Sequence, residues 1–323
     1  MTKIYSMFLA AVVALSFAAC GGATPTPVTG DTTQDIRVYT APNADGKITT
    51  ATVEKAFETT GFSIDGNNNM NKPFTKRFGT TWYKTYHLAT VHHQDITARL
   101  AKDYPNIGLL TPLSMSIWSS NDNKSMSVSS LTLRGMSRIT GIPMENKDLI
   151  ELATLMDTAL KAALPGGHYE AKSYAKVAPM DKPLASLFTT EFEIEDDETL
   201  EDAKDSFEEE FEAEMEVNFL LPGFVGLNDE LIERGVDVYD FYDTYSVCKL
   251  EVIHPISKVH PEVGAFAPCT FFLYKKKGEP TVHMGFPSVD NWITATDMED
   301  EYSLKPLISA QNVFVETLKG IIE

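Results

Sequence analysis

Two cysteines in the second half of the chain have the chemistry for redox or metal-binding work. Cys248 and Cys269 form an even pair once the third cysteine, Cys20, is set aside. In an oxidising compartment they could form a disulfide, which for a loop of about 20 residues contributes roughly 3 kcal/mol in the chain-entropy model. The alternatives are two buried thiols that pack as small hydrophobic groups, or a redox or metal-binding pair. The lack of a Cys-x-x-Cys spacing disfavours thioredoxin-like chemistry.

Histidines near the expected strand ends are the other candidate ligands. His92, His254 and His260 are positions from which imidazoles could bind a metal ion or a small anion. His93 follows His92 directly, and adjacent strand residues face opposite sides, so these two cannot share one ion without a turn. The chain carries no H-E-x-x-H motif. Surface or hydrogen-bonded histidines are the alternative to a metal site.

The remaining cysteine ends a segment typical of a bacterial signal peptide. Lys3 precedes an apolar stretch over residues 7–17, and small residues lead to Cys20. This pattern resembles a lipobox, in which the cysteine is acylated and the chain is cut before it; the alternative is an ordinary secretory signal. Several acyl chains anchor a protein durably to a membrane. Because Gly21 rather than Asp follows, resemblance to enteric lipoprotein sorting predicts the outer membrane, facing the periplasm.

The charge distribution limits the classes of partner. The net charge is −19, which argues against nucleic acid, since phosphates require a basic face. Most of it is local, because residues 191–216 hold fifteen Asp or Glu and one Lys. We expect a helix over residues 198–216 whose charges are a solvated face, or alternatively a surface that docks a protein or binds cations. After residue 20 no stretch is long and apolar enough to span a bilayer.

Apolar periodicity predicts alternating strands and helices that would position these residues. The cysteines fall at strand ends that flank one connecting segment, and residues 67–72 and 119–124 are expected to be a loop and a turn. Expected strands are 35–41, 81–91, 107–118, 125–133, 187–194, 236–247, 265–274 and 281–286; expected helices are 52–60, 94–103, 147–164, 198–216, 228–234 and 303–322.

An internal repeat relates the two halves. Residues 79–118 align with residues 235–274 at a constant offset of 156 without a gap. Glycines, prolines and aromatic residues match in register, and such residues fix backbone angles or fill large core volumes. The matched pairs include Gly79 with Gly235, Tyr86 with Tyr242, Pro105 with Pro261, Gly108 with Gly264 and Pro112 with Pro268. The repeat predicts one fold used twice.

The order of residues around the cysteines has a counterpart in a known family. Cys248 is followed by a Pro, a Gly, a Pro-Cys step and a hydrophobic strand, while the first copy has His92 and Leu113 at the cysteine positions. This block resembles the bacterial and archaeal family called domain of unknown function 302. The resemblance implies a compact two-layer α+β domain whose single-domain members pair as dimers, so that a tandem copy is a covalent dimer.

Departures from the family pattern confine any thiol chemistry to the second half. The Asn-Pro step usual after the first cysteine is Lys249-Leu250 here and His93-Gln94 in the first copy. Pro255 should kink or shorten the helix expected after Cys248. The first copy has neither cysteine. The resemblance brings no activity with it.

We therefore expect an α+β protein of two tandem two-layer α/β-sandwich repeats packed as a pseudo-dimer. The expected segments are a signal peptide (1–19), a lipidated cysteine with a flexible tether (20–34), the first repeat (35–164), a linker (165–186) and the second repeat (187–323). No G-x-S-x-G or G-x-x-x-x-G-K-[ST] motif occurs. The expected function is non-enzymatic: a lipid-anchored periplasmic binding or accessory protein with a ligand cleft between the repeats. The alternatives are a thiol- or metal-dependent redox protein using Cys248 and Cys269, and a docking role for the acidic helix. No cofactor is strongly implied.

Overall fold

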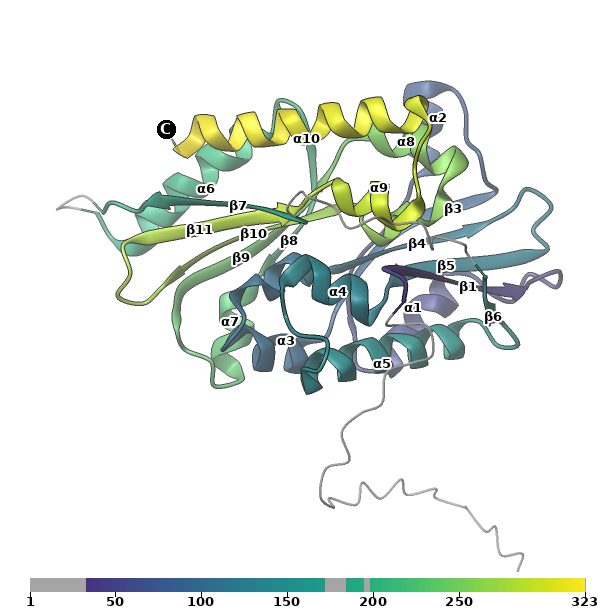
Figure 1. Cartoon of the computed structure of the whole chain (residues 1–323), viewed down its shortest axis with the longest axis horizontal. Helices are drawn as coiled ribbons and strands as arrows, with labels where there is room; N and C mark the ends of the chain where they lie inside the picture. The colour runs from purple at the N-terminus through teal and green to yellow at the C-terminus, as the bar shows by residue number, and fades with distance from the viewer. Residues whose placement is uncertain (1–32, 172–183, 195–197, 323) are drawn as a thin grey trace, which may run out of the picture.

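The computed structural model describes residues 33–171, 184–194 and 198–322. The signal peptide, Cys20, nearly all of the tether and residues 172–183 of the linker lie outside the described residues. Within the described part of the chain, every helix is too short or too polar to cross a bilayer. The structure is mixed α/β, with two antiparallel sheets and helices against both (Figure 1).

Sheet A belongs to the first half of the chain. Its strand order is β2-β3-β4-β5-β1-β6, and each neighbouring pair for which a register is defined is antiparallel. Tyr39, Ile117 and Val128 lie opposite one another in the strand pairing, so they share one face of the sheet, and all three are buried. The strands are β1 (Ile36–Pro42), β2 (Ser63–Asn69), β3 (Thr85–His92), β4 (Leu113–Ser119), β5 (Ser125–Leu131) and β6 (His168–Tyr169).

Helices of the first half begin at side chains that cap them. Thr49 accepts from the backbone N–H of Thr52 at the start of α1, and Asn146 accepts from Asp148 and Leu149 at the start of α5. Their apolar stripes meet under sheet A, where α1 and α5 lie together (Figure 1). The elements are α1 (Thr50–Thr59), α2 (Asn71–Phe78), α3 (Gln94–Ala101), the 3-10 helix η1 (Pro105–Leu110), α4 (Leu133–Thr140) and α5 (Lys147–Ala163).

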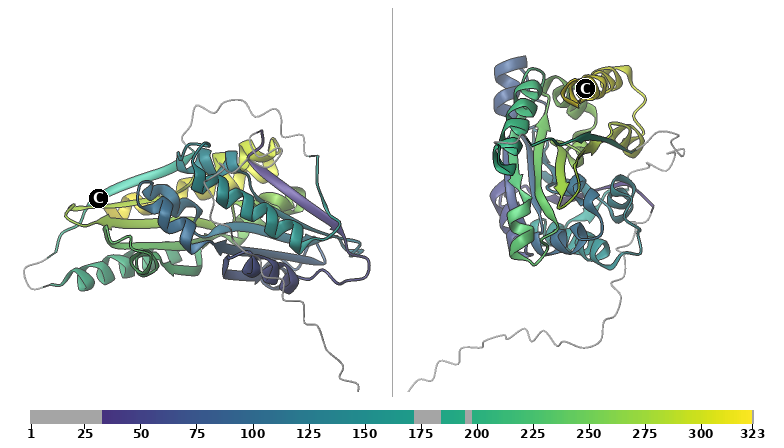
Figure 2. Two further views of the ribbon diagram at one scale, coloured as in Figure 1. Left: turned by 90° about the horizontal axis from the view of Figure 1, so that it is seen from below. Right: turned by 90° about the vertical axis from the view of Figure 1, so that its left-hand side faces the viewer.

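The second half repeats this order of elements. Sheet B reads β8-β9-β10-β11-β7, so β8 to β11 and β7 occupy the places of β2 to β5 and β1. Helices α6 and α10 lie together on the side of the molecule opposite α1 and α5, and the two halves form opposite ends of an elongated body (Figures 1 and 2). The elements are β7 (Ala185–Glu191), α6 (Leu200–Glu216), β8 (Leu220–Gly226), α7 (Leu227–Glu233), β9 (Tyr239–Cys248), α8 (Leu250–Val259), η2 (Pro261–Ala265), β10 (Cys269–Lys276), β11 (Thr281–Pro287), α9 (Asp290–Thr296) and α10 (Glu301–Ile322).

Sheet B buries both of its faces, each against a different partner. Phe241, Tyr245 and Phe271 pack in a cluster with residues of α6 and α10. Tyr242 and Phe272, one position along each strand, belong to a second cluster that also contains the core of the first half. The hydrophobic core is therefore continuous from one half into the other.

Reciprocal hydrogen bonds join the halves at positions 156 residues apart. The Tyr86 hydroxyl donates to the Pro261 carbonyl at 3.1 Å, and the Tyr242 hydroxyl donates to the Pro105 carbonyl. Ser114 donates to the carbonyl of Pro268, and Thr270 donates to that of Pro112. These two pairs of contacts are thus reciprocal.

Glycines in η1 and η2 allow this approach. A Cβ on Gly108 would lie 2.5 Å from the Tyr242 hydroxyl, and a Cβ on Gly264 would lie 2.3 Å from the Cβ of Ser116. Any larger residue would push the halves apart.

Most predicted elements are confirmed, and the differences have local causes. Residues 67–72 are not a loop, since they complete β2 and begin α2. β2 is an edge strand, so its asparagines pair through the backbone with β3 while their side chains stay partly exposed. The strand expected at 107–118 begins only at Leu113, because η1 occupies the residues before it.

Some elements of both halves were missed. α4, β8 and α9 were not predicted from the sequence, and α8 was expected to be kinked or shortened at Pro255. It instead continues to Val259, because Val252, Ile253 and Ile256 bury its inner face. Glu208, expected on the solvated face of the acidic helix, points inward and is buried.

Candidate functional site

The two cysteines lie at adjoining strand ends, as predicted. β9 ends at Cys248, β10 begins at Cys269, and α8 and η2 connect them. Cys269 is opposite Val247 in the strand pairing, so Cys269 and Val247 share one face while Cys248 faces the other. Both residues are free cysteines. This alternation explains why the structure holds two thiols rather than a disulfide.

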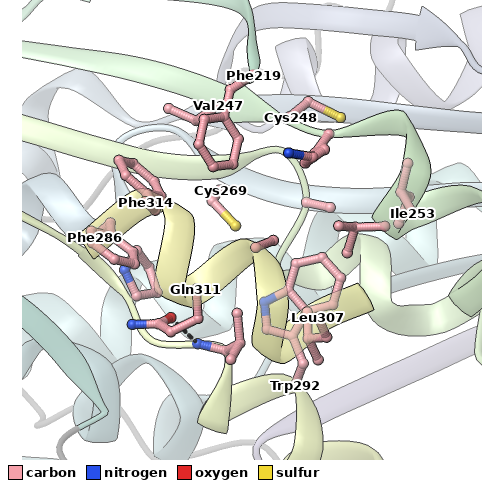
Figure 3. A pocket seen from close by; sticks show the side chains of 16 residues that line it. Phe219, Val247, Cys248, Ile253, Cys269, Phe286, Trp292, Leu307, Gln311 and Phe314 are labelled. Carbon is pink, nitrogen blue, oxygen red and sulfur yellow. Dashed lines mark hydrogen bonds between the residues drawn. The ribbon is translucent and has the colours of Figure 1, made fainter. Parts of the chain in front are cut away.

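An apolar cavity adjoins both thiols. The Cys269 sulfur points into it, and Cys248 lies at its edge (Figure 3). Its volume is about 40 Å³, which admits a slender apolar group rather than a bulky one. The lining comes from β9, α8, β10, β11, α9 and α10 and comprises Phe219, Val247, Cys248, Lys249, Val252, Ile253, Ala267, Cys269, Phe286, Pro287, Val289, Trp292, Leu307, Ala310, Gln311 and Phe314.

The environment of the thiols keeps them protonated. Burial raises the pKa of Cys248 to about 12, and the backbone N–H of Lys249 offsets this only in part. Burial and the neighbouring Cys248 raise the pKa of Cys269 to about 12. The thiolate is the nucleophile and the metal-binding form, so neither sulfur is activated at neutral pH.

Few polar groups border the cavity, and one of them has no partner. Gln311 is satisfied, since its Oε1 accepts from the Val289 N–H at 3.1 Å and its Nε2 donates to Ser186 at 2.9 Å. The indole N–H of Trp292 is buried and has no hydrogen-bond partner among the described residues. Apolar walls with a single available donor are typical of a site for a ligand that ends in a hydrogen-bond acceptor.

A cation borders the same cavity. The Lys249 ammonium lies 5.0 Å from the centre of the Phe219 ring, and both residues belong to the lining. This cation–π contact holds a positive charge beside the apolar walls. An amphiphile with an anionic or acceptor head fits such a combination.

A second cavity lies at the junction of the halves. Met70 and Leu88 from the first half face Leu220 and Pro222 from β8 across a space of about 140 Å³. Cys248 lines this cavity as well as the first. One cavity therefore lies between the halves, whereas the cavity with both cysteines lies within the second half.

His92 occupies a charged site instead of a metal site. Its Nδ1 lies 2.9 Å from both carboxylate oxygens of Asp65, and its Nε2 lies 2.9 Å from Glu230 Oε2 in the other half. Burial lowers the pKa of His92, but its hydrogen bonds to the two carboxylates outweigh this and raise the pKa to about 9. The imidazolium therefore bridges the halves as the centre of a carboxylate–histidine–carboxylate triad.

His254 and His260 have separate surroundings. The His254 ring stacks on Phe78 at 4.2 Å, and burial lowers its pKa. His260 Nε2 lies 3.6 Å from Asp300. Within residues 33–171, 184–194 and 198–322, no three His, Cys, Asp or Glu side chains are grouped as metal ligands would be. The structure thus does not bring the proposed metal ligands His92, His254 and His260 together.

Several residues of these sites were not found from the sequence. Trp292, Phe219 and Leu307 reach the cavity through tertiary packing, and Asp65 and Glu230 reach His92 from positions 27 and 138 residues away. The sequence feature that could have located the cavity was the position of Cys248 and Cys269 at strand ends.

Comparison with solved structures gives a structural likeness. No family model matches the chain, and no curated protein matches it. Among solved structures, the chain is similar to the uncharacterized conserved protein DUF302 from Bacillus stearothermophilus, with 15% identity and a TM-score of 0.34. The match covers 43% of this chain and 98% of that one.

Proposed function

We propose that this protein is a lipid-anchored periplasmic binding or accessory protein of two repeats packed as a pseudo-dimer. The repeat architecture is supported by the shared strand order of the two sheets and by the reciprocal hydrogen bonds of Tyr86 and Tyr242. The anchor at Cys20 and the outer-membrane location rest on the sequence. Radiolabelled fatty acid should label the wild-type chain but not a Cys20→Ser variant; equal labelling of both contradicts the anchor.

The ligand of the second repeat is a small molecule with a short apolar end and an acceptor head, such as a short-chain fatty acid. The observation that carries this proposal is the apolar cavity with the unpartnered Trp292 indole N–H on its wall. The hydrocarbon chain would lie among the apolar side chains, and a head oxygen would accept from the indole. Lys249 adds a charge of the sign that a carboxylate requires.

Calorimetric titration with propanoic acid tests this assignment. Leu307→Trp should abolish binding by filling the cavity, since Leu307 is 1% exposed and lines it. Ile308→Trp, on the next residue of α10, is the matched control because Ile308 is 46% exposed. Trp292→Phe keeps an aromatic ring, although a smaller one, but removes the donor and should weaken binding about fivefold, the value of one hydrogen bond. Undiminished binding by Leu307→Trp contradicts the proposal.

The alternative is a redox protein using Cys248 and Cys269, and it is favoured by the position of both thiols on one cavity. Thiol titration of the native protein with and without reductant separates the two. Two free thiols under both conditions support binding; a reductant-dependent pair supports redox chemistry. Metal content of the purified protein tests the metal-dependent form.

A further inference from the structure

The outer edge of sheet B carries unpaired backbone groups. Strand β7 is the last strand of this sheet, and among the described residues only β11 pairs with it (Figure 1). Just beyond its ends, the Ser288 N–H donates to the Leu184 carbonyl and the Phe192 N–H donates to the Pro280 carbonyl. The direction of the backbone groups alternates along a strand, so even-numbered residues of β7 face β11. The N–H and C=O groups of its odd-numbered residues, within Ala185–Glu191, point away from the sheet.

The open edge of β7 corresponds to an occupied edge in the first half. Val38 of β1 pairs with Ser129, and Leu187 of β7 pairs with Gly285; these two partners are 156 residues apart, as in the sequence repeat. β1 and β7 are therefore the same strand of the repeated fold and can be compared position by position. The same register matches Tyr39 with Phe188 and Thr40 with Thr189.

Strand β6 shows what this edge of the fold can hold. It pairs antiparallel with β1 at Tyr39, and the Glu170 N–H donates to the Val38 carbonyl at 2.9 Å. Tyr39 lies opposite Tyr169 in this pairing, with the two ring centres 4.7 Å apart. The first half therefore predicts the occupant of the second: an antiparallel strand that places an aromatic residue opposite Phe188.

A second copy of β7 meets this requirement. When two β7 strands run antiparallel about a two-fold axis at Phe188, each Phe188 lies opposite its counterpart, and Leu187 lies opposite Thr189 of the other copy. The outward backbone groups of Leu187 and Thr189, both of which have exposed side chains, then exchange hydrogen bonds. We propose that two molecules of this protein associate through their β7 strands, which joins their B sheets into one continuous sheet.

The composition of β7 permits this self-pairing in a chain whose net charge is −19. Its sequence, ASLFTTE, has a single charged residue, Glu191. In the antiparallel pair Glu191 lies opposite Ala185, so the two carboxylates are at opposite ends of the interface. Edge strands that avoid pairing usually carry a lysine, a proline or a bulge, and β7 has none of these. A basic peptide from another protein would have only Glu191 to pair with along β7, which favours a second copy as the occupant.

Sedimentation velocity of the full chain in density-matched detergent tests the proposal. Seven residues a side are fewer than the about 20–30 of a standard interface, so we expect a reversible dimer with a dissociation constant of about 1–100 µM. Thr189→Pro removes an outward N–H that β11 does not use, and the two-fold axis doubles the loss. The dimer should therefore weaken at least about tenfold. Thr189→Val keeps this N–H and is the matched control, which should stay within about twofold of the wild type.

Cysteine cross-linking tests the register of the pairing. Leu187→Cys and Thr189→Cys chains, mixed in equal amounts and mildly oxidised, should form a disulfide-linked dimer, since the pairing places these positions about 5.5 Å apart. Either variant alone should give at least about fivefold less, because identical positions are then diagonal neighbours beyond the reach of a disulfide. The wild-type chain gives the background.

Three results would overturn the proposal. The first is a monomer at every concentration up to about 200 µM. The second is a dimer that Thr189→Pro leaves unchanged, and the third is cross-linking as strong within each cysteine variant as in the mixture. If Thr189→Pro unfolds, Leu187→Lys is the deciding variant: it keeps the backbone of β7, sets like charges near the axis and should weaken the dimer about fivefold.

Discussion

The ends of β3 and β9 occupy the same place in the two halves, yet they are built in opposite ways. His92 at the end of β3 is a charged imidazolium between Asp65 and Glu230. Cys248 at the end of β9 is a neutral thiol beside an apolar cavity. The same backbone position therefore carries two kinds of site. Neighbouring carboxylates make the site at His92 ionic, and neighbouring apolar side chains make the site at Cys248 apolar.

The residues that follow continue this contrast. His93 packs its ring edge-on against Phe62 at 5.5 Å and fills the space beside β3. Lys249 places its ammonium over Phe219, and the corresponding space beside β9 adjoins the cavity. Phe62 precedes the edge strand β2, and Phe219 precedes the edge strand β8. The residue packed against this phenylalanine is a histidine ring in the first half and a lysine ammonium in the second.

The largest expected effect comes from breaking the triad. His92→Ala should lower the free energy of unfolding by about 3 kcal/mol, because it leaves two carboxylates without their shared cation. Urea denaturation measures this change. Cys248→Ala at the equivalent position is the control and should cost about 1 kcal/mol. Adding Asp65→Asn and Glu230→Gln to His92→Ala should restore part of the loss; a loss unchanged by these substitutions contradicts the ionic interpretation.

The pH dependence of stability distinguishes the two strand ends further. The pKa of His92 is raised from 6.5 to about 9, so its contribution is fully present below pH 6.5 and is lost as the pH rises through 9. The unfolding free energy should fall by about 3 kcal/mol at most over that window. Denaturation midpoints at a series of pH values measure it. The His92→Ala variant should lack this dependence, and an identical profile in both proteins excludes the triad as its source.

Thiol reactivity tests the apolar side of the comparison. With pKa values near 12, Cys248 and Cys269 should react with an aromatic disulfide reagent at least about tenfold more slowly in the native protein than in urea. Absorbance of the released thiolate gives both rates. Rapid labelling of two thiols in the native state would show that the cavity activates them.

The smallest expected effect concerns Lys249. Lys249→Ala removes the cation from Phe219 and should cost about 0.5 kcal/mol of stability. Thermal denaturation resolves this loss, and Lys249→Arg, which keeps the cation, should largely avoid it. A loss of similar size in both variants would assign the effect to side-chain packing instead of charge.

The sequence predicted the alternation of strands and helices because apolar periodicity is a local property. It also placed Cys248 and Cys269 correctly at strand ends. It did not predict β2, since the asparagines of residues 67–69 look like a loop and become a strand only by pairing with β3. Secondary structure stabilised by a neighbouring strand leaves little trace in composition.

The candidate sites were less predictable than the fold. The Asp65–His92–Glu230 triad joins residues from both halves, and no spacing rule connects them. Glu208 was expected to be solvated, because a helix with this many acids presents most of them to water. It is buried instead because Lys204, one turn earlier, accompanies it toward Asp243.

The shared core also imposes an order of events on biosynthesis. The first half is synthesised before Tyr242 and Phe272. In the folded protein these two residues pack against the first half. Until then the backbone N–H of Gly108 and the apolar surface around it face water. The nascent first half is therefore the species that a folding helper would need to protect.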